Sequence, residues 1–219
     1  MIAENLNKIR NSINHSCLAA GRNPDEIRLI AVSKTVSADI INQAIETGIT
    51  DFGENKAQEL VDKYHQLGDK VPWHFIGHLQ TNKAKYAVRT ADYIHSVDSV
   101  KLASEINKQA AKLNKKQKVL LEIKTSSEES KFGLDNEEDI YEVARFCRDA
   151  EFLNPVGLMT IAPYTGDENL IRKSFTDLRI LKDNLNKDGH SLTELSMGMT
   201  SDFTIAIEEG ATMLRIGSA

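Results

Sequence analysis

Residues 28–34 read Arg-Leu-Ile-Ala-Val-Ser-Lys, a short apolar run that ends in a primary amine at Lys34. A run of this length, rich in branched apolar residues, is typical of a buried strand. Amphipathic helical patterns separate it from later runs, and strict alternation of strands and helices predicts a parallel sheet. Seven more apolar runs of similar character follow along the chain, at residues 50–53, 73–76, 93–97, 118–124, 153–159, 193–196 and 212–216.

The number of repeats decides between two α/β architectures. Eight strands favour closure into a (β/α)8 TIM barrel, whereas an open doubly wound sheet ordinarily has fewer strands. The spacing of Ile2, Leu6, Ile9 and Ile13 predicts an extra N-terminal helix over residues 2–20. Because the chain stops just after the eighth strand, we expect this helix to replace the eighth barrel helix. No low-complexity linker divides the sequence, so we expect a single domain over residues 1–219.

Composition excludes several classes of protein. Hydrophobic residues make up 41% of the chain and charged residues 27%, which are ordinary values for a globular protein. The net charge of −5 provides no positive field for nucleic acid or an anionic membrane. Since no signal sequence or run of ~18 apolar residues is present, we expect a cytoplasmic protein. Cys17 and Cys147 are far apart and are expected to be small buried hydrophobes.

Lys34 is the first candidate for chemistry. Binding groups of barrels of this kind lie at the carboxyl ends of the strands, and Lys34 follows the first strand directly. Two interpretations are open, an ordinary surface lysine and a nucleophile. A lysine partly desolvated at this position would lose some preference for its charged form, and the neutral amine is the form that attacks an aldehyde.

Two segments near the end of the chain resemble phosphate-binding loops. They are Ser196-Met197-Gly198-Met199-Thr200-Ser201 and Arg215-Ile216-Gly217-Ser218. Glycine lets backbone N–H groups approach an anion, and the hydroxyl groups add donors. Phosphate sites after strands seven and eight recur in this fold. An amine combined with a phosphate site predicts an aldehyde phosphate as ligand, and we expect the cofactor pyridoxal 5′-phosphate.

Further candidate ligands follow other strands. Asn55 is placed to hydrogen-bond the cofactor's ring hydroxyl, His78 to line the pocket mouth, and Met159 to end the sixth strand beside it. Arg215 lies within an apolar strand, where it either forms a buried ion pair, for example with Glu194, or faces the pyridine nitrogen. A cation there would keep that nitrogen unprotonated.

No metal site is expected from the sequence. His74 and His78 are four residues apart, a spacing that suits a shared metal only on a helix. Residues 73–76 have the pattern of a strand, so the two rings should not face one site.

Six motifs stand out along residues 28–218: Val32-Ser33-Lys34-Thr35, Phe52-Gly53-Glu54-Asn55, residues 73–83, Lys131-Phe132-Gly133-Leu134, Gly157-Leu158-Met159 and residues 195–202. Together they resemble the pyridoxal phosphate homeostasis proteins. The resemblance implies a barrel like the N-terminal half of bacterial alanine racemase, with the cofactor as a Schiff base on Lys34. It also implies phosphate contacts from Ser196, Met197, Gly198, Met199, Thr200, Gly217 and Ser218, with Arg215 near the ring nitrogen.

Two departures from the family pattern stand out. Lys124 occupies a position where the family usually carries Asn in its fifth-strand motif. The chain also stops short of the family's usual aliphatic-Phe-Gly ending, and we interpret it as a possible C-terminal truncation.

Three functions remain open from the sequence. The first is a carrier or buffer that holds the cofactor reversibly for vitamin B6 homeostasis and supplies pyridoxal phosphate-dependent apo-enzymes. The second is an amino-acid racemase-type enzyme, which needs an acid/base on each face of the substrate. In alanine racemase the second one is a tyrosine brought by a β-rich domain, and no such domain follows here, which favours the carrier. The third is a barrel that binds another phosphorylated metabolite without a Schiff base. We expect a monomer.

Overall fold

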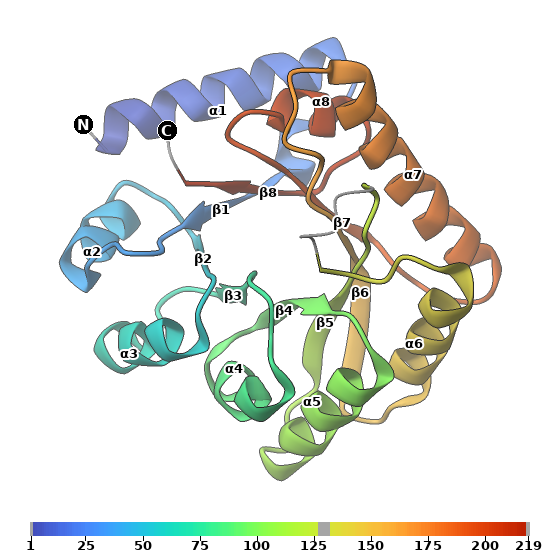
Figure 1. The fold of residues 1–219 in the computed structure, drawn as a ribbon. Helices are drawn as coiled ribbons and strands as arrows, with labels where there is room; N and C mark the ends of the chain where they lie inside the picture. Colours follow the sequence, from blue (N-terminus) through green and yellow to red (C-terminus); the bar gives the residue numbers. More distant parts are fainter. Residues whose placement is uncertain (1, 127–131, 218–219) are drawn as a thin grey trace.

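The computed structural model describes residues 2–126 and 132–217. In this part of the chain, eight parallel strands pair in sequence order and close into a barrel, with the first strand next to the last. Figure 1 views this barrel from the end where the strands lead into the loops that precede the helices. The strands are β1 (Arg28–Val32), β2 (Asp51–Glu54), β3 (Trp73–Phe75), β4 (Tyr93–Val97), β5 (Gln117–Glu122), β6 (Leu153–Met159), β7 (Glu194–Met199) and β8 (Met213–Ile216).

Helices surround the barrel on its outer face. One helix follows each of the first seven strands, and Figure 1 shows them as a ring. Asn136 and Asp167 cap the starts of α6 (Glu137–Asp149) and α7 (Glu168–Lys187) by accepting hydrogen bonds from backbone N–H groups. The seven helices are α2 (Ala38–Glu46), α3 (Ala57–Leu67), α4 (Ala84–Thr90), α5 (Val100–Lys112), α6 (Glu137–Asp149), α7 (Glu168–Lys187) and α8 (Phe203–Glu208).

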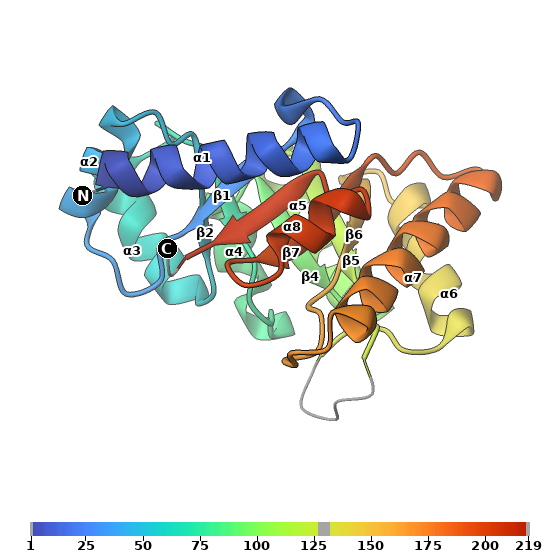
Figure 2. The same ribbon diagram turned by 90° about the horizontal axis from the view of Figure 1, so that it is seen from above.

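The N-terminal helix α1 (Ile2–Ala19) completes the ring. It contacts α8 on one side and α2 on the other, and Figure 2 shows it lying along the outside of β8 and β1. Its buried face carries Leu6, Ile13 and Cys17. The prediction that an N-terminal helix replaces the eighth barrel helix is therefore confirmed for the described residues.

Strand alternation divides the core into two layers. Ile30, Tyr93, Leu120, Met159 and Met213 form a small cluster inside the barrel. Their strand neighbours point outward and pack against the helices in a much larger cluster. The position of a residue in this alternation decides whether its side chain reaches the barrel interior or the helix layer.

The predicted strands agree with the structure except at their ends. The largest difference concerns β7, which was expected to end at Ser196 but continues to Met199. The reason is pairing with β8, where Met199 lies opposite Arg215 after a register shift. Part of the segment predicted as a phosphate loop is thus strand. No helix among the described residues has the length and apolar character needed to cross a membrane.

Candidate functional site

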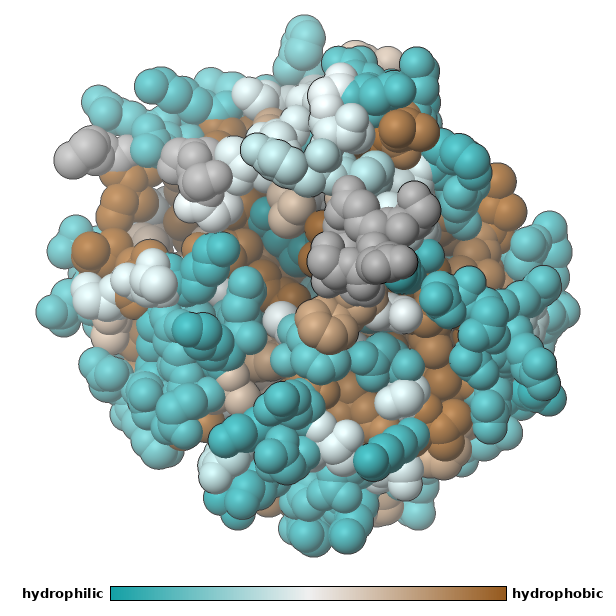
Figure 3. Space-filling model, in the orientation of Figure 1, coloured by the Kyte–Doolittle hydropathy of each residue, from teal (hydrophilic) through white to brown (hydrophobic). Residues whose placement is uncertain are grey.

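One end of the barrel gathers most of the residues singled out from the sequence. Because all eight strands are parallel, the residues that follow them meet at the same end. Figure 3 shows this end as a ring of mainly hydrophilic residues around a central depression. The candidate residues placed there are Lys34 after β1, Asn55 after β2, His78 after β3, Met159 at the end of β6, Thr200 after β7 and Gly217 after β8.

Lys34 lies on a sharp turn directly after β1. The next residue, Thr35, has a φ of 65°, a left-handed conformation that is uncommon for a β-branched residue. Such outliers concentrate at functional sites, where surrounding contacts maintain them. Lys34 itself is exposed, so the expectation that burial behind the strand would desolvate its amine is wrong for this structure.

A buried ionic cluster holds the residues on both sides of Lys34. The Lys63 ammonium on α3 donates to the Glu54 carboxylate at 2.6 Å and to the Glu59 carboxylate at 2.7 Å. The same ammonium donates to the carbonyl oxygen of Ser33 at 2.6 Å. The backbone N–H of Thr35 donates to Glu59 Oε1 at 2.6 Å. The cluster therefore fixes the backbone immediately before and after the candidate nucleophile.

Glu54 is the acceptor at the centre of this cluster. It is fully buried, and the Ser33 hydroxyl also donates to Glu54 Oε1 at 2.6 Å. Burial raises the pKa of the Glu54 carboxyl, while the hydrogen bonds from Lys63 and Ser33 oppose that effect. Lys63 was not among the residues singled out from the sequence. The Glu59–Lys63 spacing of four residues on a helix was the available signal.

The two segments predicted to bind phosphate meet in space. The Gly217 backbone N–H donates to Thr200 Oγ1 at 3.4 Å, which places the end of β8 beside the residues that follow β7. Gly198 has a φ of 94°, and a Cβ atom there would lie 2.6 Å from the Cβ of Ala206 on α8. Glycine at 198 is thus required by backbone conformation and by close packing of α8.

Three predicted phosphate ligands need correction or lie outside the structure. Ser196 is a strand residue with no exposed surface, and its hydroxyl contacts Arg215 and His95 inside the barrel. Its hydroxyl therefore forms its hydrogen bonds inside the barrel, and the prediction that this side chain binds phosphate is wrong for this structure. The Met197 side chain packs in the core cluster between the strands and the helices, so only its backbone is available to a phosphate. Ser218 lies outside the described residues.

Arg215 is buried at the same end of the barrel. Its Nη1 donates to Ser196 Oγ at 2.6 Å, and its Nη2 donates to the carbonyl oxygen of Thr160 at 2.8 Å. The proposed ion pair with Glu194 does not form, because Glu194 accepts a hydrogen bond from Thr212 instead. Burial lowers the pKa of Arg215 to about 10, which still leaves a cation at neutral pH.

A buried carboxyl group, Glu122, lies at the end of β5, two residues beyond the interior residue Leu120. Its Oε2 atom is buried without a hydrogen-bond partner in the structure. Burial, followed by the nearby Asp98 carboxylate, raises the pKa of Glu122 to about 7, and Arg215 opposes the shift. A buried polar atom without a partner, in a carboxyl group that feels the charge of a buried guanidinium, fits a barrel end that receives a polar ligand.

An aromatic contact on the rim joins a residue that follows β3 to one that follows β5. The rings of His78 and Phe132 are stacked with their centroids 3.8 Å apart, and His78 Nδ1 lies 3.6 Å from Asp98 Oδ2. His78 thus lies on the rim as expected, with Asn55 exposed at the end of β2. His74 points into the barrel instead, and within the described ranges no group of three metal-ligating side chains occurs.

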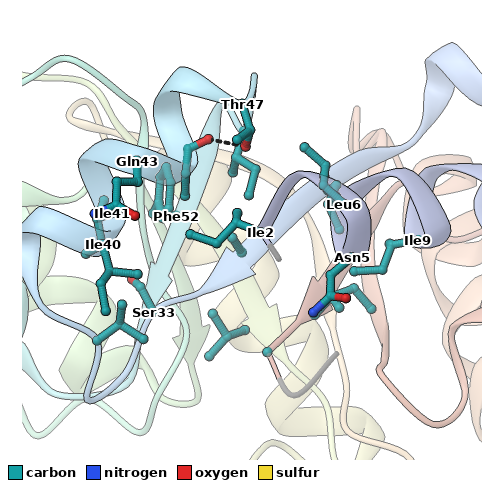
Figure 4. Close-up of a pocket in the computed structure, with 18 of the residues that line it drawn as sticks. Ile2, Asn5, Leu6, Ile9, Ser33, Ile40, Ile41, Gln43, Thr47 and Phe52 are labelled. Carbon is teal, nitrogen blue, oxygen red and sulfur yellow. Dashed lines mark hydrogen bonds between the residues drawn. The ribbon is translucent and has the colours of Figure 1, made fainter.

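A groove of about 820 Å³ lies between α1 and the β1–α2 unit, and Gly217 of the candidate site belongs to its lining. Figure 4 shows Ile2 and Leu6 of α1 on one side, with Ile41 and Phe52 across from them. Its lining is mostly apolar. A phosphorylated ligand needs donors and positive charge, so this groove is a poorer candidate for it than the barrel end.

Comparison with known proteins identifies the family. The family model "Alanine racemase, N-terminal domain" matches residues 2–219. The pyridoxal phosphate homeostasis protein of Aquifex aeolicus is 41% identical over 217 residues, which cover 98% of this chain and 95% of that relative. The chain belongs to the pyridoxal phosphate homeostasis protein family. The Escherichia coli protein of that name is 38% identical over 226 residues, covering 100% of this chain and 94% of the relative.

Solved structures agree with the fold. PipY of Synechococcus elongatus, determined with pyridoxal phosphate bound, matches with a TM-score of 0.88 and 35% identity, covering 100% of this chain and 98% of PipY. An alanine racemase of Clostridium difficile matches with a TM-score of 0.80 over 98% of this chain and 56% of its own. At 16% identity, the racemase comparison supports the barrel fold alone.

Proposed function

We propose that this chain binds pyridoxal 5′-phosphate as a Schiff base on Lys34 and acts in intracellular vitamin B6 homeostasis as a carrier or buffer. The observation that carries the proposal is the common location of an exposed amine, a buried guanidinium and the Thr200–Gly217 contact at one end of the barrel. The relatives named as pyridoxal phosphate homeostasis proteins and the cofactor-bound PipY support it.

Each group has a chemical role in this proposal. The neutral Lys34 amine adds to the aldehyde carbon of the cofactor, a carbon–nitrogen double bond forms, and one water molecule leaves. Thr200 and Gly217 hold the phosphate, Arg215 donates toward the ring nitrogen, and Asn55 donates toward the ring hydroxyl. When bound, the cofactor supplies an electrophilic carbon to amines.

The exposure of Lys34 supports reversible binding. Water reaches the carbon–nitrogen bond at an exposed position, so hydrolysis returns the aldehyde and the free amine. This behaviour suits a carrier that releases cofactor to pyridoxal phosphate-dependent apo-enzymes. We extend the proposal to a monomer that works in the cytoplasm, which is compatible with the free thiols of Cys17 and Cys147.

The test is borohydride reduction of the protein incubated with pyridoxal phosphate, followed by peptide mass spectrometry. We expect one pyridoxyl adduct on Lys34, its loss in Lys34→Ala, and its retention in Lys124→Ala, which removes another lysine that follows a strand. An adduct that persists in Lys34→Ala, or that maps to Lys124, would contradict the Schiff base assignment. Steady racemisation of alanine by the purified protein would favour the racemase-type enzyme instead.

A further inference from the structure

A continuous chain of hydrogen bonds runs through the barrel interior behind Arg215. Ser196 Oγ, which accepts from Arg215 Nη1, lies 2.9 Å from His95 Nδ1. His95 Nε2 lies 2.9 Å from His74 Nδ1, and His74 Nε2 lies 3.0 Å from Asp51 Oδ1. The residues come from β8, β7, β4, β3 and β2, so this series of hydrogen bonds crosses most of the barrel.

Asp51, at the far end, determines the donor and acceptor of every hydrogen bond in this series. Asp51 is an acceptor when ionised; although burial raises its pKa, hydrogen bonds from His74 and Thr50 lower it overall. His74 must then donate from Nε2, and its neutral ring accepts at Nδ1. His95 must donate from Nε2 to His74, which leaves its own Nδ1 as an acceptor.

Both histidines are held in the neutral form that this direction requires. His74 and His95 have no exposed surface, and burial lowers the pKa of each ring, that of His95 to well below its ordinary range. The Arg215 and Arg28 guanidinium groups also disfavour a second proton on His95. Tyr93 stacks on His74 at a centroid distance of 4.5 Å, which fixes the plane of that ring.

We propose that His95, supported by His74 and Asp51, is a positioning residue that fixes the Ser196 hydroxyl so that its oxygen lone pair faces Arg215. The inference rests on the proposed function, because it takes pyridoxal phosphate as the ligand beside Arg215. With His95 Nδ1 as its acceptor, the Ser196 proton points away from the guanidinium. Without that acceptor the hydroxyl rotates, and one staggered orientation directs its proton at Arg215. Arg215 Nη1 then loses its fixed acceptor, and the guanidinium that faces the cofactor ring is no longer held in one orientation.

Two substitutions of His95 separate positioning from packing. The side-chain oxygen of His95→Asn reaches approximately the place of Nδ1 and keeps an acceptor for Ser196, while the link to His74 is lost. The side-chain nitrogen of His95→Gln reaches approximately the place of Nε2 and keeps the link to His74, while the acceptor for Ser196 is lost. If His95 only fills space, the two variants should behave alike.

The first measurement uses the wild-type chain without cofactor. Histidine ¹⁵N chemical shifts should show both His74 and His95 protonated on Nε2 and unprotonated on Nδ1. The second measurement is the pyridoxal phosphate dissociation constant, with melting temperatures as the control for folding. We expect His95→Gln to weaken pyridoxal phosphate binding about tenfold and His95→Asn less than about threefold. The larger loss corresponds to one hydrogen bond, between position 95 and the Ser196 hydroxyl that accepts from Arg215. His65→Gln, on the exposed surface of α3, should leave binding unchanged.

Each outcome decides the inference. A His95 protonated on Nδ1, or equal losses in the two His95 variants, would overturn the positioning role while leaving the proposed function intact. A wild-type chain that binds no pyridoxal phosphate would overturn the proposed function and this inference with it. The nitrogen assignment needs no variant, so a variant that fails to fold does not remove the test.

Discussion

The Lys63 ammonium lies 2.6 Å from the carbonyl oxygen of Ser33, the residue that precedes Lys34. Lys63 is buried, with 6% of its surface exposed, so this contact is shielded from water. Through Glu59, the same ammonium is connected to the backbone N–H of Thr35 on the other side of Lys34. The side chain of the candidate nucleophile is thus exposed, while its backbone is held from both sides.

Lys63→Met should destabilise the fold and loosen the turn that carries Lys34. Breaking a buried ion pair by removing one partner costs roughly 3–5 kcal/mol, because the Glu54 charge is left buried. Denaturant unfolding measures this loss, and the fraction of chain trapped by borohydride measures the effect on Lys34. Lys70→Met, which removes an exposed lysine, is the matched control and should change neither quantity.

The double variant Glu54→Gln with Lys63→Met separates the two effects. It removes the uncompensated charge, so most of the lost stability should return. The tether to Ser33 stays absent, so trapping at Lys34 should remain impaired. Full recovery of trapping in the double variant would show that the cluster contributes stability alone.

Glu122 should make stability depend on pH. Its pKa is raised from the usual 4.5 to about 7 in the folded chain, so the folded state retains a proton that the unfolded state has lost. The stabilising contribution is complete below pH 4.5 and is lost as pH rises through 7, a difference worth roughly 3 kcal/mol. Glu122→Gln should therefore gain more stability over wild type at pH 8 than at pH 5.

Denaturant midpoints of wild type and Glu122→Gln at both pH values provide the comparison. Glu138→Gln, an exposed carboxyl on α6, serves as the control and should show the same small difference from wild type at both pH values. Equal gains for Glu122→Gln at pH 5 and pH 8 would mean that this carboxyl is ionised in the folded chain at both.

Much of the fold could be predicted because buried parallel strands are continuous apolar runs. The alternation of eight such runs with helical patterns was sufficient to predict the barrel. The spacing of apolar residues over residues 2–20 was sufficient to predict α1 (Ile2–Ala19). The end of β7 was mispredicted because Gly198 and its polar neighbours look like a loop. Only pairing of Met199 with Arg215 shows that the strand continues, and pairing between distant strands leaves no local signal.

The candidate site was only partly predictable for the same reason. Lys34 and Arg215 could be singled out locally, because a charged residue stands out at the end of an apolar run, as Lys34 does, or inside one, as Arg215 does. The hydroxyl of Ser196 contacts His95, which is 101 residues away in the sequence. The interior hydrogen bond of Ser196 therefore exists only in the closed barrel and leaves no local signal. Lys63 was missed because its ion pair with Glu54 forms between a helix and the strand before it.

Gly77→Ala should disturb the site through Asn55. A Cβ atom on residue 77 would lie 2.1 Å from the Asn55 carbonyl oxygen, too close for any side chain, so the backbone of one segment must move. We expect a loss of roughly 1–3 kcal/mol in stability and weaker retention of pyridoxal phosphate, measured by unfolding and by dialysis. Gly166→Ala is the control, since nothing lies within 4 Å of its added Cβ. Unchanged cofactor retention in a destabilised Gly77→Ala would argue that Asn55 makes no contact with the cofactor.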